Sequence, residues 1–177
     1  MRQRPQINPI YRRPEIDGLR AIAVLVIILY HAKIVIFGRD WFEGGYIGVD
    51  IFFVISGYLI TRIILEELFK TGSFSFLKFY ERRVRRILPM LFTVMLVTFP
   101  FAWKYLLPAN FLEYSKSILS AVLFSSNFFF YFVTTEYGAE SSLMKPFLHS
   151  WSLGVEEQFY IVFPIVLVFL YKFLRKH

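Results

Sequence analysis

The chain has 177 residues, and its 20 basic and 13 acidic side chains give a net charge of +7. Hydrophobic residues make up 56% of it and aromatic residues 20%, against about 45–50% apolar residues in soluble domains. A soluble globule of this size could not bury that much apolar surface, and disordered chains are poor in apolar residues, so both classes are excluded. Because there is no cysteine, disulfides and cysteine-ligated metals are excluded as well. We expect neither a metal site nor a bound cofactor.

Five apolar runs determine the predicted fold class. They predict helices near residues 20–37, 46–65, 87–107, 115–133 and 155–174. A bilayer-spanning helix needs about 20 apolar residues, and long runs without alternation favour helices over a barrel. The sequence therefore predicts an all-α, polytopic transmembrane bundle of about five helices, forming one domain over residues 1–177.

The distribution of basic residues predicts the topology. Residues 1–20 and 62–86 contain five and seven of them, which favours a cytoplasmic amino terminus and a cytoplasmic 62–86 loop. Five crossings would then place the basic tail, residues 172–176, outside. Either this tail leads to further helices or a segment within 134–157 is re-entrant. We expect the first, and therefore a domain that is incomplete at its carboxyl end.

The first two predicted helices carry ionisable residues within apolar sequence. Arg20 and His31 are eleven residues apart, about 16 Å along a helix, and share a face. His31 is thus expected near mid-membrane, either as a functional group or as a hydrogen-bonded core residue. Asp50 fits a helix-end carboxylate as well as a catalytic one. Ser56 and Gly57 form a small-residue face, which favours close helix packing.

Four arginines precede the third predicted helix: Arg82, Arg83, Arg85 and Arg86. They follow aromatic residues in FSFLKFYERRVRR, a pattern typical of a short interfacial helix. One interpretation is a basic anchor that contacts anionic lipids. The other is an anion site, because arginines three residues apart share a helical face and bind phosphate in a bidentate manner.

A polar cluster precedes the fifth predicted helix. Residues 149–160 read HSWSLGVEEQFY and contain His149, Trp151, Ser152, Glu156 and Glu157. Carboxylates at a helix start are stabilised by the helix dipole, so the pair can be ordinary capping residues. The same groups could also transfer protons at a membrane boundary. No motif typical of a serine hydrolase, a phosphate-binding loop or a zinc protease is present.

Four segments together resemble acyltransferase family 3, whose members are integral-membrane enzymes. They are EIDGLRAIAVLVIILYH from residue 15, GYIGVDIFFVISGYLIT from residue 45, FYERRVRRILP from residue 79 and LHSWSLGVEEQFY from residue 148. The family O-acylates bacterial surface polysaccharides on a fold of about ten helices. The resemblance covers residues 14–171 and implies the first half of such a domain, completed by missing carboxyl-terminal helices or by a homo-oligomer.

The resemblance also implies roles for individual residues. The family's basic residue and essential histidine fall on Arg20 and His31, and its Arg-x-x-Arg pair falls on Arg83 and Arg86, which are expected to contact cytoplasmic acyl-coenzyme A. Its tryptophan segment falls on Trp151, Ser152, Glu156 and Glu157, while two further motifs include Asp17 and Asp50.

Acyl transfer from a thioester to a sugar hydroxyl fits these residues, because a histidine can serve as base or as nucleophile. We expect acyl-coenzyme A as co-substrate, a surface glycan or lipid-linked sugar as acceptor, membrane lipids as partners and the bacterial inner membrane as location. A nucleic-acid partner is not expected, since the basic residues crowd the helix ends. The alternative is a non-enzymatic membrane protein, half of a transporter or a lipid-binding scaffold.

Overall fold

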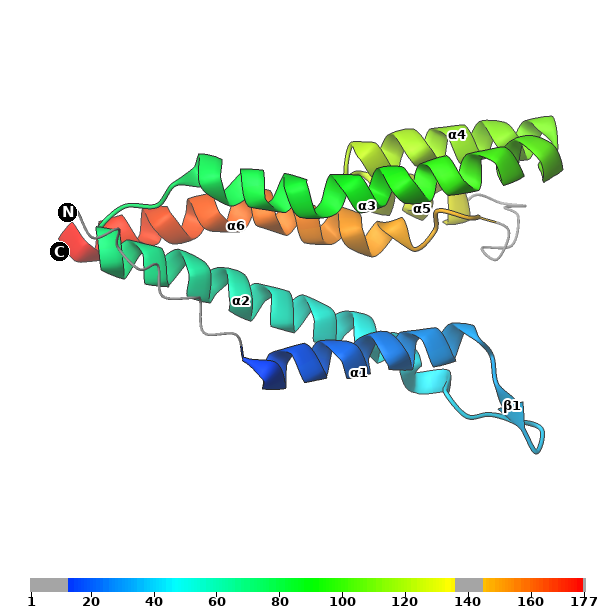
Figure 1. The fold of residues 1–177 in the computed structure, drawn as a ribbon, viewed down its shortest axis with the longest axis horizontal. Coiled ribbons are helices and arrows are strands. Elements are labelled where there is room, and N and C mark those ends of the chain that lie inside the picture. Colours follow the sequence, from blue (N-terminus) through cyan, green and yellow to red (C-terminus); the bar gives the residue numbers. More distant parts are fainter. Residues whose placement is uncertain (1–12, 136–144, 177) are drawn as a thin grey trace, which may run out of the picture. The chain divides into compact units, whose positions relative to one another are not determined.

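A computed structural model describes residues 13–135 and 145–176. It divides the chain into two compact units, residues 1–59 and 60–177, which are described separately below. Helices make up almost all of the described chain, with one two-stranded hairpin in the first unit (Figure 1). The predicted all-α class is confirmed.

Helix α1 (Pro14–His31) opens the first unit. Pro14 is preorganised for the first helical turn, and Glu15 and Asp17 complement the positive end of the helix dipole. The chain leaves the helix after His31 and adopts a positive φ of 45° at Lys33. The expected helix over 20–37 is therefore wrong at both ends, because a turn interrupts the apolar run that suggested it.

A tight hairpin follows α1. Strands β1 (Val35–Ile36) and β2 (Arg39–Asp40) pair antiparallel, with Val35 opposite Asp40 and Ile36 opposite Arg39. Phe37 and Gly38 both have positive φ, as a two-residue hairpin turn requires. The 3-10 helix η1 (Glu43–Tyr46) then leads into α2 (Ile47–Thr71).

Two long helices follow in the chain. Helix α2 ends at Thr71. Gly72 follows, with a φ of 73° that suits a left-handed helix terminus and an amide that donates to the Leu68 carbonyl. Helix α3 (Phe76–Tyr105) is continuous, with Pro89 and Pro100 inside it. The predicted separate interfacial helix is thus wrong. The arginine segment forms the first turns of α3, because neither glycine nor proline occurs between residues 76 and 88.

The expected helix over 115–133 is two helices, α4 (Pro108–Val122) and α5 (Ser126–Thr135). The break falls at Phe124, where φ is 51°, and the Ser125 carbonyl accepts the first amides of α5. With 15 and 10 residues, α4 and α5 are about 22 and 15 Å long. Neither is long enough to span a hydrocarbon core of about 30 Å, and the two helices pack against each other as a helical hairpin (Figure 1).

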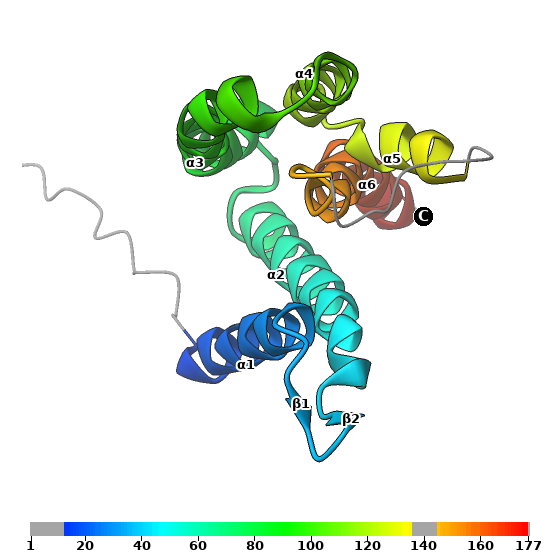
Figure 2. The same cartoon turned by 90° about the vertical axis from the view of Figure 1, so that its right-hand side faces the viewer.

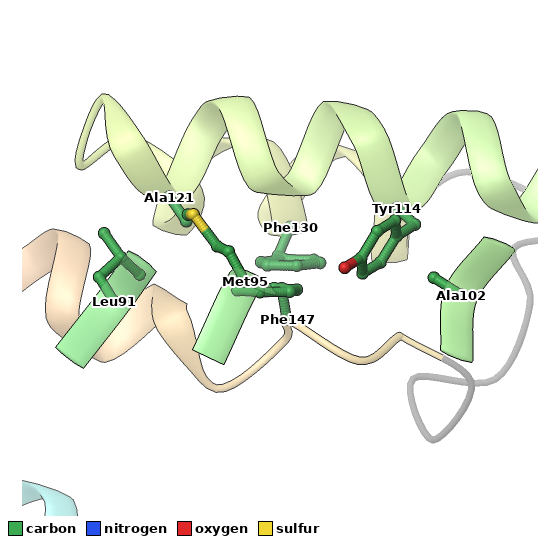
Figure 3. Close-up of a cluster of buried hydrophobic side chains, with 7 residues drawn as sticks. All are labelled: Leu91, Met95, Ala102, Tyr114, Ala121, Phe130 and Phe147. Atoms are coloured by element: carbon green, nitrogen blue, oxygen red, sulfur yellow. The ribbon is translucent and has the colours of Figure 1, made fainter. Parts of the chain in front are cut away.

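Helix α6 (Ser150–Lys176) packs along α5, and α4 packs along α3 (Figures 1 and 2). One buried cluster joins α3, α4, α5 and the segment just before α6, and Figure 3 shows its side chains: Leu91, Met95, Ala102, Tyr114, Ala121, Phe130 and Phe147. A second joins α2, the start of α3 and α6: Ile60, Ile64, Leu68, Phe79, Tyr160 and Val168. Since the start of α3 meets the later part of α6, the two helices are antiparallel.

Within the described residues, three helical segments are long and apolar enough to cross a membrane: Glu43–Thr71, Phe76–Tyr105 and Ser150–Arg175. The rings of Phe69 and Tyr171 are 5.5 Å apart, so α6 ends beside the end of α2. The basic tail therefore lies beside the end of α2. The expected single crossing helix over 115–133 is wrong, because α4 and α5 are each too short to span a bilayer. The side of the membrane on which the tail lies stays a prediction.

Candidate functional site

Arg20 and His31 lie on the same helix, α1, as predicted. The Arg20 guanidinium stacks on the Phe52 ring at 5.3 Å, which holds it against the start of α2. His31 is exposed and is the last residue of α1, with its ring 5.0 Å from the Tyr30 ring. The predicted helix over 20–37 would enclose His31, but in the structure the helix ends there. The depth of His31 in the membrane stays a prediction.

Two glycines allow α1 to approach the segment that follows the hairpin. A Cβ atom on Gly45 would lie 2.5 Å from Tyr30 Cβ, and one on Gly48 would lie 2.6 Å from the Ala23 carbonyl oxygen. Only glycine fits such contacts. The packing also places the Tyr46 ring 6.1 Å from the Tyr30 ring, so Tyr30 is held beside His31.

The other candidates in this unit occupy helix termini or packing faces. Asp17 is exposed in the first turn of α1, and Asp50 is exposed in the first turn of α2. Ser56 is buried on α2, next to Gly57. These placements match the helix-end and packing interpretations of the sequence.

The structure distinguishes the four arginines at the start of α3. Arg85 forms an ion pair with Glu81, with 2.8 Å between Nη2 and Oε1, at an exposed position. Arg82 and Arg86 are also exposed, whereas Arg83 is half-buried and faces α6. Arg83 is therefore the member of the cluster that the fold fixes most closely.

Arg83 lies between two aromatic rings. Its guanidinium carbon is 4.7 Å from the Tyr160 ring centre and 5.5 Å from the Phe79 ring centre. Both rings are core residues, 3% and 1% exposed. Within the described residues no hydrogen bond or ion pair engages the Arg83 N–H groups. Stacking thus orients the guanidinium and leaves its donors available for a ligand.

The two glutamates next to this arginine differ in their surroundings. Glu156 accepts a short hydrogen bond from the Tyr160 hydroxyl, the same residue whose ring holds Arg83. Glu157 is 8% exposed, and its Oε1 atom has no hydrogen-bond partner in the part of the chain that the structure describes. Both carboxylates interact electrostatically with Arg83. Arginine, tyrosine and glutamates therefore form one charged cluster between α3 and α6.

The remaining predicted residues lie at the start of α6. Trp151 and Ser152 occupy its first turn, and His149 precedes it. The Ser152 hydroxyl donates to the His149 carbonyl at 3.2 Å. Ser152 lies eight residues before Tyr160, about 12 Å along the helix, and one turn before Glu156.

Several residues of this region were not predicted from sequence. Tyr160 links Arg83 to Glu156, and its position four residues after Glu156 on one helix was the available signal. Asn127 and Gln158 form a reciprocal amide pair, and Gln158 Nε2 also donates to the Phe124 carbonyl at 2.8 Å. The polar run Ser125–Ser126–Asn127 within an apolar stretch was the signal for this break.

Comparison with known proteins identifies the family. Residues 13–177 match the family model described as an acyltransferase domain. The chain belongs to this acyltransferase family. It is 39% identical over 159 residues to the O-acetyltransferase OatA of Staphylococcus aureus strain NCTC 8325, a match that covers 89% of this chain and 25% of OatA.

A second protein, from Staphylococcus aureus strain COL, also carries an O-acetyltransferase name, given provisionally. It is 42% identical over 163 residues, covering 92% of this chain and 26% of that protein. The chain thus spans about a quarter of the length of the curated relatives it matches. No solved structure matches it. The family assignment confirms the resemblance that the four motifs carry.

Proposed function

We propose that this chain is part of a membrane O-acyltransferase. In this proposal an acyl group, acetyl in the simplest case, moves from cytoplasmic acyl-coenzyme A to a hydroxyl of a cell-surface polysaccharide or lipid-linked sugar. Family membership supports the reaction class, and the O-acetyltransferase names of the relatives support acetyl. The observation on which the donor assignment depends is the oriented guanidinium of Arg83.

The donor assignment follows from the chemistry of Arg83 and Arg86. Coenzyme A carries phosphates, which guanidinium groups bind through paired N–H donors. Arg83 is oriented before any ligand binds, so little entropy is lost when it engages a phosphate. Arg86, three residues later on α3, is exposed and available to the same anion.

The proposed transfer needs one base. The acceptor oxygen attacks the thioester carbon, a C–O bond forms, and the C–S bond breaks to release the coenzyme A thiolate. His31 takes the proton of the hydroxyl and returns a proton to the thiolate, so atoms and charges balance. Arg20, on the same helix, is proposed to support His31, and Glu156 and Glu157 are proposed to act beside the donor.

The proposed location is the bacterial inner membrane, with the amino terminus and the arginine segment in the cytoplasm. Residues 1–20 and 62–86 contain five and seven of the 20 basic residues. Collecting basic residues on one side agrees with the positive-inside rule.

Coenzyme A binding by the purified chain tests the proposal. Arg83→Gln should abolish binding, whereas Lys78→Gln, which removes one exposed charge from the same helix, should retain it. In cells, His31→Ala should remove the added acyl mass from the surface polysaccharide while membrane insertion is unchanged. A wild-type chain that does not bind coenzyme A would instead favour the transporter or scaffold alternative.

A further inference from the structure

An open groove of about 340 Å³ lies between the two helices of the α4–α5 hairpin. Its walls are apolar, with Leu119 and Leu123 on α4 and Phe128 and Phe132 on α5. Lys116 is the charged residue among those that line it. Its volume falls within the range of small-molecule sites, about 300–1,000 Å³.

Contacts with α3 indicate the depth of this groove. The Tyr114 hydroxyl and Thr98 Oγ1 share a hydrogen bond of 2.9 Å. Thr98 belongs to the charge-free stretch of α3 between residues 87 and 103, which is the part of that helix suited to hydrocarbon. The α4–α5 hairpin therefore packs on the apolar stretch of α3.

Lys116 lies at the shallow end of the groove. It is eight residues after Pro108, where α4 begins, about 12 Å along the helix. Side chains on a helix lean toward its amino end, so the ammonium group extends toward the membrane surface. Leu123 and Phe128 lie at the deep end, near the break between the helices.

Lys116 has no ion pair among the described residues, although a second lysine of this region does. Lys145 Nζ lies 3.2 Å from Glu113 Oε2 and is almost fully buried. An ammonium group without an ion pair at the mouth of an apolar groove favours an anionic partner. Because every other wall residue is apolar or a serine, that partner must bring both an anionic group and an apolar chain.

We propose that the groove binds a lipid with an anionic phosphate headgroup. Its apolar chain lies along the leucine and phenylalanine walls, and its phosphate pairs with Lys116 at the mouth. Charge and shape together select this occupant, since a neutral or zwitterionic lipid would leave the lysine without a net counter-charge. This inference is independent of acyl transfer and stands or falls separately from it.

Lipid retention by the chain provides the test. We would reconstitute it in bilayers of equal amounts of phosphatidylglycerol and phosphatidylcholine and count retained lipids by native mass spectrometry. The wild type should prefer phosphatidylglycerol, and Lys116→Gln should reduce that preference about fivefold, the effect of one basic residue near an anionic membrane surface. Leu123→Trp, which narrows the deep end, should reduce retention of that lipid as well.

Lys104→Gln provides the matched control. Lys104 lies in the last turn of α3, is exposed and is not among the groove residues, so its loss should leave the preference intact. Three results would overturn the proposal: no preference in the wild type, an unchanged preference in Lys116→Gln, or an equal loss in both lysine variants. The last would mean that general surface charge recruits the lipid.

Discussion

Replacing Gly48 by alanine should separate α1 from the start of α2. The added Cβ atom would lie 2.6 Å from the Ala23 carbonyl oxygen and 2.7 Å from Ile27 Cγ1. The isoleucine side chain can rotate, but the carbonyl oxygen belongs to the α1 backbone. Relief of the clash therefore requires the helix itself to move.

The size of the effect follows from these distances. Comfortable contact needs about 3.5 Å, so the backbone must shift by roughly 1 Å. Overpacking of this kind costs about 1–3 kcal/mol. For a chain of this length, 1 kcal/mol corresponds to about 2–4 °C in Tm. We expect Gly48→Ala to lower Tm by roughly 2–12 °C.

Thermal unfolding in detergent, followed by fluorescence, measures this change. Gly44→Ala is the matched control, because a Cβ atom at Gly44 has nothing within 4 Å and its φ is not positive. That variant should keep or slightly raise Tm, since alanine is the better helix former. Equal melting temperatures for both variants and the wild type would show that the close approach of α1 does not exist.

Gly45→Ala tests whether Tyr30 positions His31. The new Cβ atom would meet Tyr30 Cβ at 2.5 Å, and the Tyr30 ring contacts His31. In the proposed acyltransferase, this variant should lower kcat more than Gly48→Ala does for an equal loss of Tm. An activity that followed Tm alone would mean that Tyr30 does not position His31.

Three further predictions concern the second unit. Because the chain has no cysteine, single cysteines introduced at Lys78 and at Lys172 can be labelled selectively from either side of the membrane. Both should react from the same side. Labelling from opposite sides would support the five-crossing topology. Gln158→Leu should lower the free energy of unfolding by about 1–2 kcal/mol, the usual contribution of a polar pair between membrane helices, and should reduce Tm in detergent. An unchanged Tm would show that the break at Phe124 does not need the Gln158 side chain. Tyr160→Leu should raise the KM for acyl-coenzyme A by about 2–30-fold, because it removes a cation–π contact of Arg83. Tyr160→Phe keeps the ring, so KM should stay near wild type while kcat changes through the lost hydrogen bond to Glu156. Equal effects of the two variants would contradict a separate role for the ring.

The order of the motifs and the charge pattern were readable from sequence because both are local. Apolar runs identify membrane helices through their length. The spacing of Arg83 and Arg86 on one helical face follows from the helical repeat. These properties do not depend on which helices later pack together, and the structure and the family match agree with them.

Helix ends were harder to predict, and His31 shows the reason. The apolar run continues past it to Phe37, so hydrophobicity alone extends the helix. In the structure, Lys33 and Phe37 adopt positive φ and a hairpin begins. After the turn, Gly45 and Gly48 pack closely on α1, and contacts of this kind leave no trace in the local hydrophobicity pattern.

The amino-acid sequence by itself determined the helical membrane class, the family and the residue types that carry the chemistry. Only the tertiary structure decided that α4 and α5 form a hairpin, because the break at Phe124 depends on a carbonyl that Gln158 satisfies from another helix. Only the tertiary structure singled out Arg83 among four neighbouring arginines, since the rings of Phe79 and Tyr160 that hold it come from positions 81 residues apart. Local periodicity records which face a side chain occupies, but the partner across that face is set by how the helices pack.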